Sequence, residues 1–128
     1  MDQISNMLNA IKTGGMVRKK TITVPYSGVK ERILECLKKE GFVSGYEKKT
    51  LKNHPTIEVE VLYVDGRPKI KDFKRVSKLS KRVYMSAKEI RPIMAGRGIL
   101  VLSTPKGVLS GKVAKKENVG GEALFQLM

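Results

Sequence analysis

The residues whose types best suit contact with a ligand lie near the end of the chain, in the stretch "ILVLSTPKGVLSGKVAKKENVGGE". Four apolar residues, 99–102, predict a short buried strand, and Ser103-Thr104-Pro105-Lys106-Gly107 must then turn the chain. Within it, Thr104-Pro105-Lys106-Gly107 has Pro at the second place and Gly at the fourth, which suits a type I turn. The corner is therefore either a plain turn or a surface that offers two hydroxyls and accessible backbone to a ligand.

Residues suited to catalysis are few. The single histidine, His54, lies between Asn53 and Pro55, in a predicted turn, and the single cysteine, Cys36, lies on a predicted amphipathic helix. A buried helical thiol and a loop imidazole make a poor nucleophile and base. The acidic residues form no cluster that would complete a metal site. We therefore expect no enzymatic activity, no catalytic residue, no bound metal and no cofactor or small-molecule substrate.

Charge is the strongest bulk signal. The chain has 128 residues with 26 Lys and Arg against 12 Asp and Glu, a net charge of +14. Residues 67–97 hold eleven Lys or Arg against Asp72 and Glu89, a net of +9, whereas residues 1–66 contribute +3. Such a surplus indicates a polyanionic partner, with nucleic acid first among the candidates. No apolar run reaches the ~20 residues of a membrane span, so we expect no membrane partner.

The basic segment "KRVSKLSKRVYMS" alternates in type. Apolar residues (Val76, Leu79, Val83 and Tyr84) are interleaved with basic ones (Lys74, Arg75, Lys78, Lys81 and Arg82). In extended chain or turns, this pattern predicts packed apolar residues and a basic surface that faces phosphates. Phosphate contacts give affinity, whereas specific recognition needs hydroxyls, stacking rings and close backbone approach. Taken singly, Tyr84 would more simply be a core residue and Glu122 an ion-pair partner.

The elements that position these residues can be predicted from periodicity. We expect a helix over residues 2–13 stopped by Gly14 and Gly15, a strand over 21–25, and a helix from Ser27 to Gly41. The buried stripe of this second helix would be Val29, Ile33, Cys36 and Leu37. Ile57, Val59 and Val61 alternate with glutamates, and Asp65-Gly66 marks a hairpin turn.

The later part of the chain combines strands with short helical elements. We expect a helical turn before Pro92, a short helix that is capped by Ser110 and ends near Gly120, and a last strand, "EALFQL". Residues 1–66 would thus form a first lobe of helix, strand, helix and antiparallel strands, and the concentration of basic charge after residue 66 marks a second part of the chain.

Several blocks together resemble one known family. "DQISNMLNAIK", "ITVPYS", "LKKEGFV", "KRVSKLSKRVY", "GRGILVLSTPKGVL" and "NVGGE" resemble, in the same order, the bacterial-type small-subunit ribosomal protein eight family. The resemblance covers essentially the whole chain. It implies the α+β fold class in two small lobes, with residues 1–66 as an α/β lobe and residues 67–128 as a mostly β lobe that binds RNA. It implies a structural protein of the cytoplasmic or organellar small ribosomal subunit, which binds the central domain of small-subunit ribosomal RNA and helps assemble the platform. It also implies contact with neighbouring ribosomal proteins of families five and twelve.

The resemblance also implies roles for particular residues. Base or sugar contacts would come from Ser103, Thr104, Gly107, Glu122 and Tyr84. Lys106 and Lys112 would add phosphate contacts near the corner, beside those that the charge pattern already predicts for Lys74, Arg75, Lys78, Lys81 and Arg82. Gly120 and Gly121 would allow close approach of the backbone, and Gly107 would let the strands come together.

Three positions depart from the family pattern. Pro105 replaces a Ser and so removes a hydroxyl and a backbone donor. Ala10 stands where the first helix commonly carries Arg, and the chain ends in "LFQLM" rather than in an aromatic finish. An alternative to the ribosomal role is an RNA-binding translational regulator that acts on messenger RNA outside the ribosome.

Overall fold

The computed structural model describes residues 2–93 and 96–128, and it confirms the α+β class. The chain forms two compact units, Met1–Lys71 and Asp72–Met128. The division lies beyond residue 66 because the two strands on either side of Asp65-Gly66 pair with each other and so keep residues 67–71 in the first unit.

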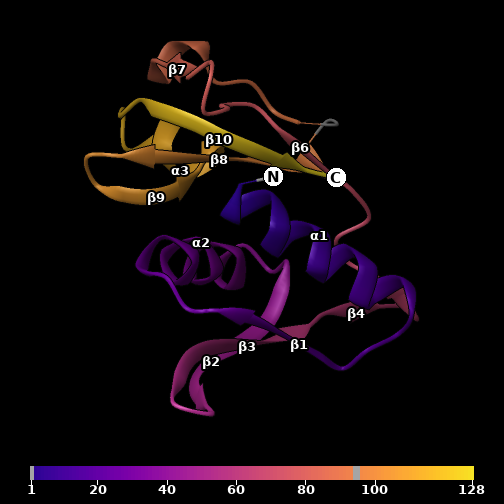
Figure 1. Cartoon of the computed structure of the whole chain (residues 1–128). Helices are drawn as coiled ribbons and strands as arrows, with labels where there is room; N and C mark the ends of the chain where they lie inside the picture. The colour runs from indigo at the N-terminus through magenta and orange to yellow at the C-terminus, as the bar shows by residue number, and fades with distance from the viewer. Residues whose placement is uncertain (1, 94–95) are drawn as a thin grey trace. The chain divides into compact units, whose positions relative to one another are not determined.

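Two helices and an antiparallel sheet make up the first unit (Figure 1). Its elements are α1 (Gln3–Met16), β1 (Thr21–Pro25), α2 (Gly28–Lys39), β2 (Val43–Leu51), β3 (His54–Val61), β4 (Tyr63–Val64) and β5 (Arg67–Pro68). The sheet order is β1-β3-β2, and Ile57, Val59 and Val61 are buried as their alternation predicted. The β4–β5 turn has positive φ at both Asp65 and Gly66, which confirms the predicted tight hairpin.

Gly14 and Gly15 do not stop α1, contrary to the prediction. The helix continues to Met16, and Arg18 (φ 59°) then takes the left-handed conformation that ends it. The glycines are instead needed for packing, since a Cβ on Gly15 would meet the ring of Pro68 at 2.9 Å. At the other end Asp2 caps the helix by accepting a hydrogen bond from the Ser5 amide at 2.8 Å.

The buried stripe of α2 was predicted one residue out of place at its start. Ile33, Cys36 and Leu37 are buried, but Val29 is 45% exposed, and the next residue, Lys30, is buried instead. The aliphatic stem of Lys30 packs along the core while its ammonium donates to the Pro25 carbonyl at 3.0 Å. Burial lowers the pKa of this ammonium. The Ser27 hydroxyl caps the helix, as predicted.

A five-stranded antiparallel sheet is the main element of the second unit. The elements are β6 (Phe73–Arg75), β7 (Tyr84–Met85), the 3-10 turn η1 (Ala87–Glu89), β8 (Ile99–Thr104), β9 (Gly107–Ser110), α3 (Gly111–Lys116) and β10 (Gly121–Leu127). The order is β6-β10-β8-β9, and β7 also pairs with β10. One cluster of its buried residues consists of Ile90, Leu100, Leu102, Ala114 and Ala123, and Val101, Leu124, Phe125 and Leu127 are buried as well.

Two predicted boundaries move in this unit. Strand β8 runs on to Thr104, so the turn is narrower than predicted and only Pro105 and Lys106 lie outside the strands. Helix α3 is capped by Ser110 as predicted but ends at Lys116 rather than near Gly120, because Asn118 (φ 57°) already takes the left-handed conformation. The predicted helical turn before Pro92 is η1, and Met94 and Ala95 lie outside the described residues.

Candidate nucleic-acid interface

The corner between β8 and β9 is closed by the Thr104 side chain. Its hydroxyl donates to the Gly107 carbonyl at 2.8 Å and accepts from the Lys106 amide at 3.1 Å. A hydroxyl has one proton to donate, so this group keeps only an acceptor position for a ligand. The Thr104 hydroxyl therefore shapes the corner, whereas Ser103 is exposed.

Three of the predicted base-contacting residues meet in one row across the sheet. Glu122 on β10 lies opposite Tyr84 on β7 and opposite Ser103 on β8. Side chains directly opposite each other in antiparallel strands project from the same face, about 5 Å apart. Tyr84 is 69% exposed. The fold thus places an aromatic ring, a carboxylate and a hydroxyl side by side, from residues up to 38 positions apart in the sequence.

The row was only partly visible in the sequence. Tyr84 was expected to pack in the core if taken alone, and Leu79 was expected to pack as well, yet Leu79 is 81% exposed. Both expectations of packing were wrong, since only Val76 and Val83 of the four interleaved apolar residues lie against the core cluster. The pairing of Tyr84 with Glu122 depends on strand register, which no local pattern near either residue indicates.

The paired glycines make close contact with the protein's own backbone. A Cβ on Gly121 would collide with the Ser103 carbonyl and Thr104 Cα, and one on Gly120 would collide with the Met85 carbonyl. These glycines therefore let β10 start tightly between β7 and β8. Gly107 was expected to do the same, but nothing would lie within 4 Å of its Cβ. Its φ of 111° shows that the turn needs glycine for conformation instead.

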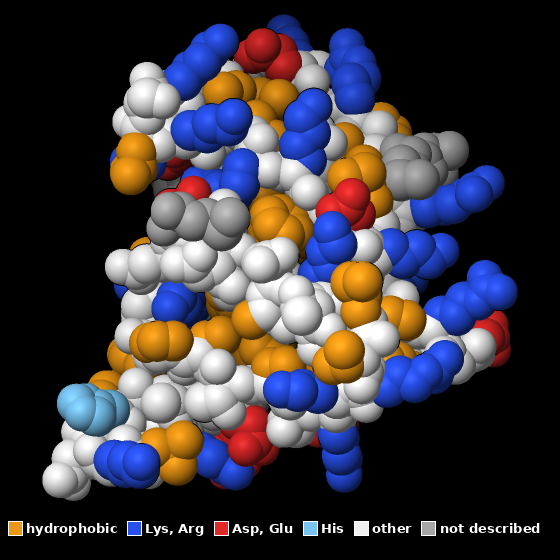
Figure 2. Space-filling model, turned by 45° about the vertical axis from the view of Figure 1, so that its right-hand side comes forward, with side chains coloured by type: hydrophobic (Ala, Val, Ile, Leu, Met, Phe, Trp, Pro, Cys, Tyr) orange, Lys and Arg blue, Asp and Glu red, His pale blue; other side chains and the backbone are white. Residues whose placement is uncertain are grey.

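The predicted phosphate-contacting residues fall into two groups. Lys74, Lys78, Lys81 and Lys112 are exposed. The other three are held by the protein itself: Arg75 donates to the Leu124 carbonyl, Arg82 pairs with Glu122 at 3.0 Å, and Lys106 pairs with Glu117 at 3.5 Å. Figure 2 shows Lys and Arg side chains standing out from the surface, with fewer Asp and Glu among them. The side chains of Arg82 and Glu122 are 52% and 16% exposed.

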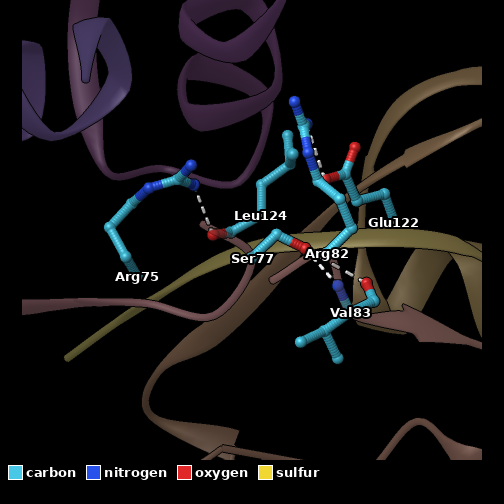
Figure 3. Close-up of polar contacts among 6 residues, drawn as sticks. All are labelled: Arg75, Ser77, Arg82, Val83, Glu122 and Leu124. Atoms are coloured by element: carbon cyan, nitrogen blue, oxygen red, sulfur yellow. Dashed lines mark hydrogen bonds and ion pairs between the residues drawn. The ribbon is translucent and has the colours of Figure 1, made fainter. Parts of the chain in front are cut away.

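A residue that sequence reasoning missed, Ser77, fixes the basic segment. Its side chain is buried, and its hydroxyl accepts from the Val83 amide at 2.8 Å and donates to the Val83 carbonyl at 3.2 Å (Figure 3). The Ser77 amide in turn donates to the Ala123 carbonyl on β10. A lone small hydroxyl within a run of lysines gives no signal of this role, because it depends on the loop returning to Val83.

The candidates for catalysis do not come together as a site. Cys36 is buried on α2, and burial raises the pKa of its thiol to about 12, so it stays protonated near neutral pH. The prediction that His54 lies in a turn was wrong. His54 is the first residue of β3, lies opposite Leu51 and is exposed. The turn there is Lys52-Asn53, with positive φ at both positions. Within residues 2–93 and 96–128, no three His, Cys, Asp or Glu side chains are grouped for a metal ion.

The same described part of the chain contains no helix with the length and apolar character to cross a membrane. Fold and surface thus define a basic α+β protein whose second, mostly β unit carries a row of polar and aromatic side chains and several exposed lysines.

Comparisons with known proteins identify the family. The model of the family described as Ribosomal protein S8 matches residues 2–128. A protein of Ruegeria pomeroyi, named small ribosomal subunit protein uS8, is 43% identical over 124 residues, covering 96% of this chain and 95% of the relative. Relatives of the same name from Novosphingobium aromaticivorans and Bradyrhizobium are 40% and 42% identical, covering 98% and 97% of this chain and 96% and 95% of the relatives. The chain belongs to the ribosomal protein S8 family, which confirms the resemblance found in the sequence.

Proposed function

We propose that the protein is a structural constituent of the small ribosomal subunit that binds the central domain of the ribosomal RNA directly and helps assemble the platform. The observation that carries this proposal is the row of Tyr84, Glu122 and Ser103, in a unit where Lys74, Lys78, Lys81 and Lys112 are exposed. An aromatic face, a hydroxyl and a carboxylate can stack on and hydrogen-bond to unstacked bases, while the lysines hold the phosphates. Its place would be the cytoplasmic or organellar ribosome, with ribosomal proteins of families five and twelve as neighbours.

Within this function the side chains have different tasks. Ser103 and Tyr84 would touch bases or sugars, and Thr104 would mainly keep the corner in shape. Lys74, Lys78, Lys81 and Lys112 would meet phosphates directly. Arg82 and Lys106 would meet phosphates only after leaving their acidic partners, Glu122 and Glu117. Arg75 and Gly107 would act chiefly by supporting the backbone.

Binding to two RNA stems across a salt series tests the proposal. One stem carries an irregular internal loop from the central domain, and the other is fully paired and of equal length. Ser103→Ala should weaken binding to the irregular stem about five-fold, the value of one neutral hydrogen bond, without changing the salt slope. The matched control, Thr104→Ser, keeps the hydroxyl that closes the corner and should bind like the parent.

The lysines should give the opposite signature. Replacing both Lys78 and Lys81 with Gln should reduce the slope of log K against log salt by about 1.4 to 1.8 on either stem. Lys38→Gln with Lys39→Gln, at the end of α2 in the first unit, removes the same charge and should leave the slope unchanged. Equal binding of the parent to both stems at every salt concentration would contradict recognition by the row.

A further inference from the structure

The loop from Ser77 to Val83, here called the 77–83 loop, presents an apolar side chain that the function above does not use. Leu79 is 81% exposed. Exposed leucines are common singly and need no explanation when their backbone is also loose. Leu79 differs because the backbone on both sides of it is held by the protein.

The tip of the loop is a tight turn. The Lys78 amide donates to the Lys81 carbonyl at 2.8 Å and the Lys81 amide donates to the Lys78 carbonyl at 3.0 Å. These reciprocal bonds leave only Leu79 and Ser80 outside the pairing. Leu79 is thus set at the tip between two exposed lysines.

The base of the loop is attached to β10. The buried Ser77 hydroxyl bridges the amide and carbonyl of Val83, and the Ala123 amide donates to the Val83 carbonyl at 2.9 Å. Just after the loop, Tyr84 pairs with Glu122 in the row. Both ends of the loop are thereby fixed to β10, the central strand of the row. Because the tip is already ordered, little conformational entropy is lost when it binds a partner.

We propose that Leu79 packs on an unstacked base or its ribose in the bound RNA, as an apolar contact presented by the rigid 77–83 loop. The inference rests on the proposed RNA-binding function. Charge complementarity selects RNA as the occupant, because the exposed Lys78 and Lys81 flank Leu79 in the chain and the loop itself has no acidic residue. In RNA of irregular structure, splayed bases offer flat apolar faces beside phosphates, which suits one leucine between lysines.

Leu79→Ser tests this contact with little risk to folding, since the side chain is mostly outside the core. We expect affinity for the irregular stem to fall about five-fold and affinity for the fully paired stem to stay the same. The salt slope should not change, because no charge is removed. Leu51→Ser is the matched control, an apolar residue 53% exposed on β2 in the first unit, and should bind both stems like the parent.

A 2-aminopurine base placed in the internal loop gives a second readout. Its fluorescence in the complex reports the packing around that base, and it should differ between the parent and Leu79→Ser but not between the parent and Leu51→Ser. Ser77→Ala should reproduce part of the affinity loss by loosening the loop, and thermal unfolding followed in parallel separates this effect from loss of fold.

The outcomes separate the inference from the function on which it rests. If the parent prefers the irregular stem and Leu79→Ser prefers it equally, with unchanged fluorescence, Leu79 does not touch RNA and the inference is wrong. If the parent has no preference for that stem, the proposed function itself fails. Unchanged RNA binding by Leu79→Ser together with loss of a ribosomal protein contact would assign the residue to a protein partner and would also overturn the inference.

Discussion

The two units differ in how they use charge and glycine. Acidic residues have partners in both units, and in the first unit the Tyr46 hydroxyl donates to Glu35 at 2.8 Å and Lys49 pairs with Glu58 at 3.2 Å; the units differ in how many basic residues stand against them. Residues 1–71 carry 14 Lys and Arg against 8 Asp and Glu, whereas residues 72–128 carry 12 against 4. The second unit therefore has three basic residues for each acidic one.

The strand glycines show the same contrast. Gly45 on β2 has open space where a Cβ would stand, whereas Gly121 on β10 would collide with backbone. A backbone neighbour cannot move aside as a side chain can. The strand position of Gly45 thus has room for a side chain, whereas that of Gly121, next to the row that we propose binds RNA, does not.

The largest expected effect is that of Gly121→Ala. The added methyl must push the Ser103 carbonyl away, so we expect a loss of about 3 kcal/mol in the free energy of unfolding, at the upper end for overpacking. Binding to the irregular stem should weaken as well, because Ser103 and Glu122 lose their register. Thermal or denaturant unfolding together with the binding assay measures both.

Gly45→Ala is the matched variant in the first unit. With nothing near the new methyl, we expect stability unchanged or raised by up to about 1 kcal/mol, since alanine restricts the unfolded chain. Equal destabilisation by the two substitutions would show that the tightness we ascribe to the position of Gly121 is not particular to it.

A smaller effect is expected from removing the carboxylate that holds Arg82. Glu122→Gln keeps the shape of the side chain but not the charge, so Arg82 becomes available to a phosphate. The salt slope should rise by about 0.7 to 0.9, the value of one added phosphate contact. Stability should change little, because Arg82 is half exposed and solvent screens such pairs.

Glu58→Gln offers the corresponding change in the first unit, where it removes the partner of Lys49. Its salt slope should match that of the parent if the second unit makes the contacts to RNA. A rise equal to that of Glu122→Gln would place phosphates against both units and would remove the functional distinction between them.

Local patterns predicted the elements well but the row only in part. The alternation of Ile57, Val59 and Val61 and the caps at Ser27 and Ser110 are signals within a few residues of sequence, and all of them are confirmed. The boundaries at Gly14 and Gly15 were wrong because a glycine needed for close packing looks, in sequence, like one that ends a helix. The same ambiguity reversed the role of Gly107.

Two things could not be predicted from the sequence: the register of the strands, and which side chains are already bonded to other groups of the protein. Tyr84, Glu122 and Ser103 come together only because β10 pairs with both β7 and β8. The family resemblance could name these residues, but it could not tell that Arg82 is held by Glu122 or that the Thr104 hydroxyl is held within the corner. Those facts depend on which groups are nearest in space, and each changes what the residue can offer to RNA.

The smallest expected effect concerns Glu89, whose carboxylate caps η1 in the second unit. It accepts from the Ser86 amide at 2.9 Å, and the hydrogen bonds from the Ser86 amide and hydroxyl lower the pKa of Glu89. A carboxyl whose pKa is lower in the folded protein stabilises the fold above its ordinary pKa, and this stabilisation is lost as pH falls through the lowered value.

Glu89→Gln should therefore melt slightly below the parent at pH 7, and the difference should shrink as the pH is lowered toward 3. Thermal unfolding at several pH values measures this. Ser86→Ala is the matched control, because it removes the hydroxyl but keeps the amide, which is the larger cause of the lowered pKa. It should keep most of the pH dependence of the parent. A difference between Glu89→Gln and the parent that stayed constant down to pH 3 would mean that packing of the η1 turn, and not the charge of Glu89, stabilises that end of the second unit.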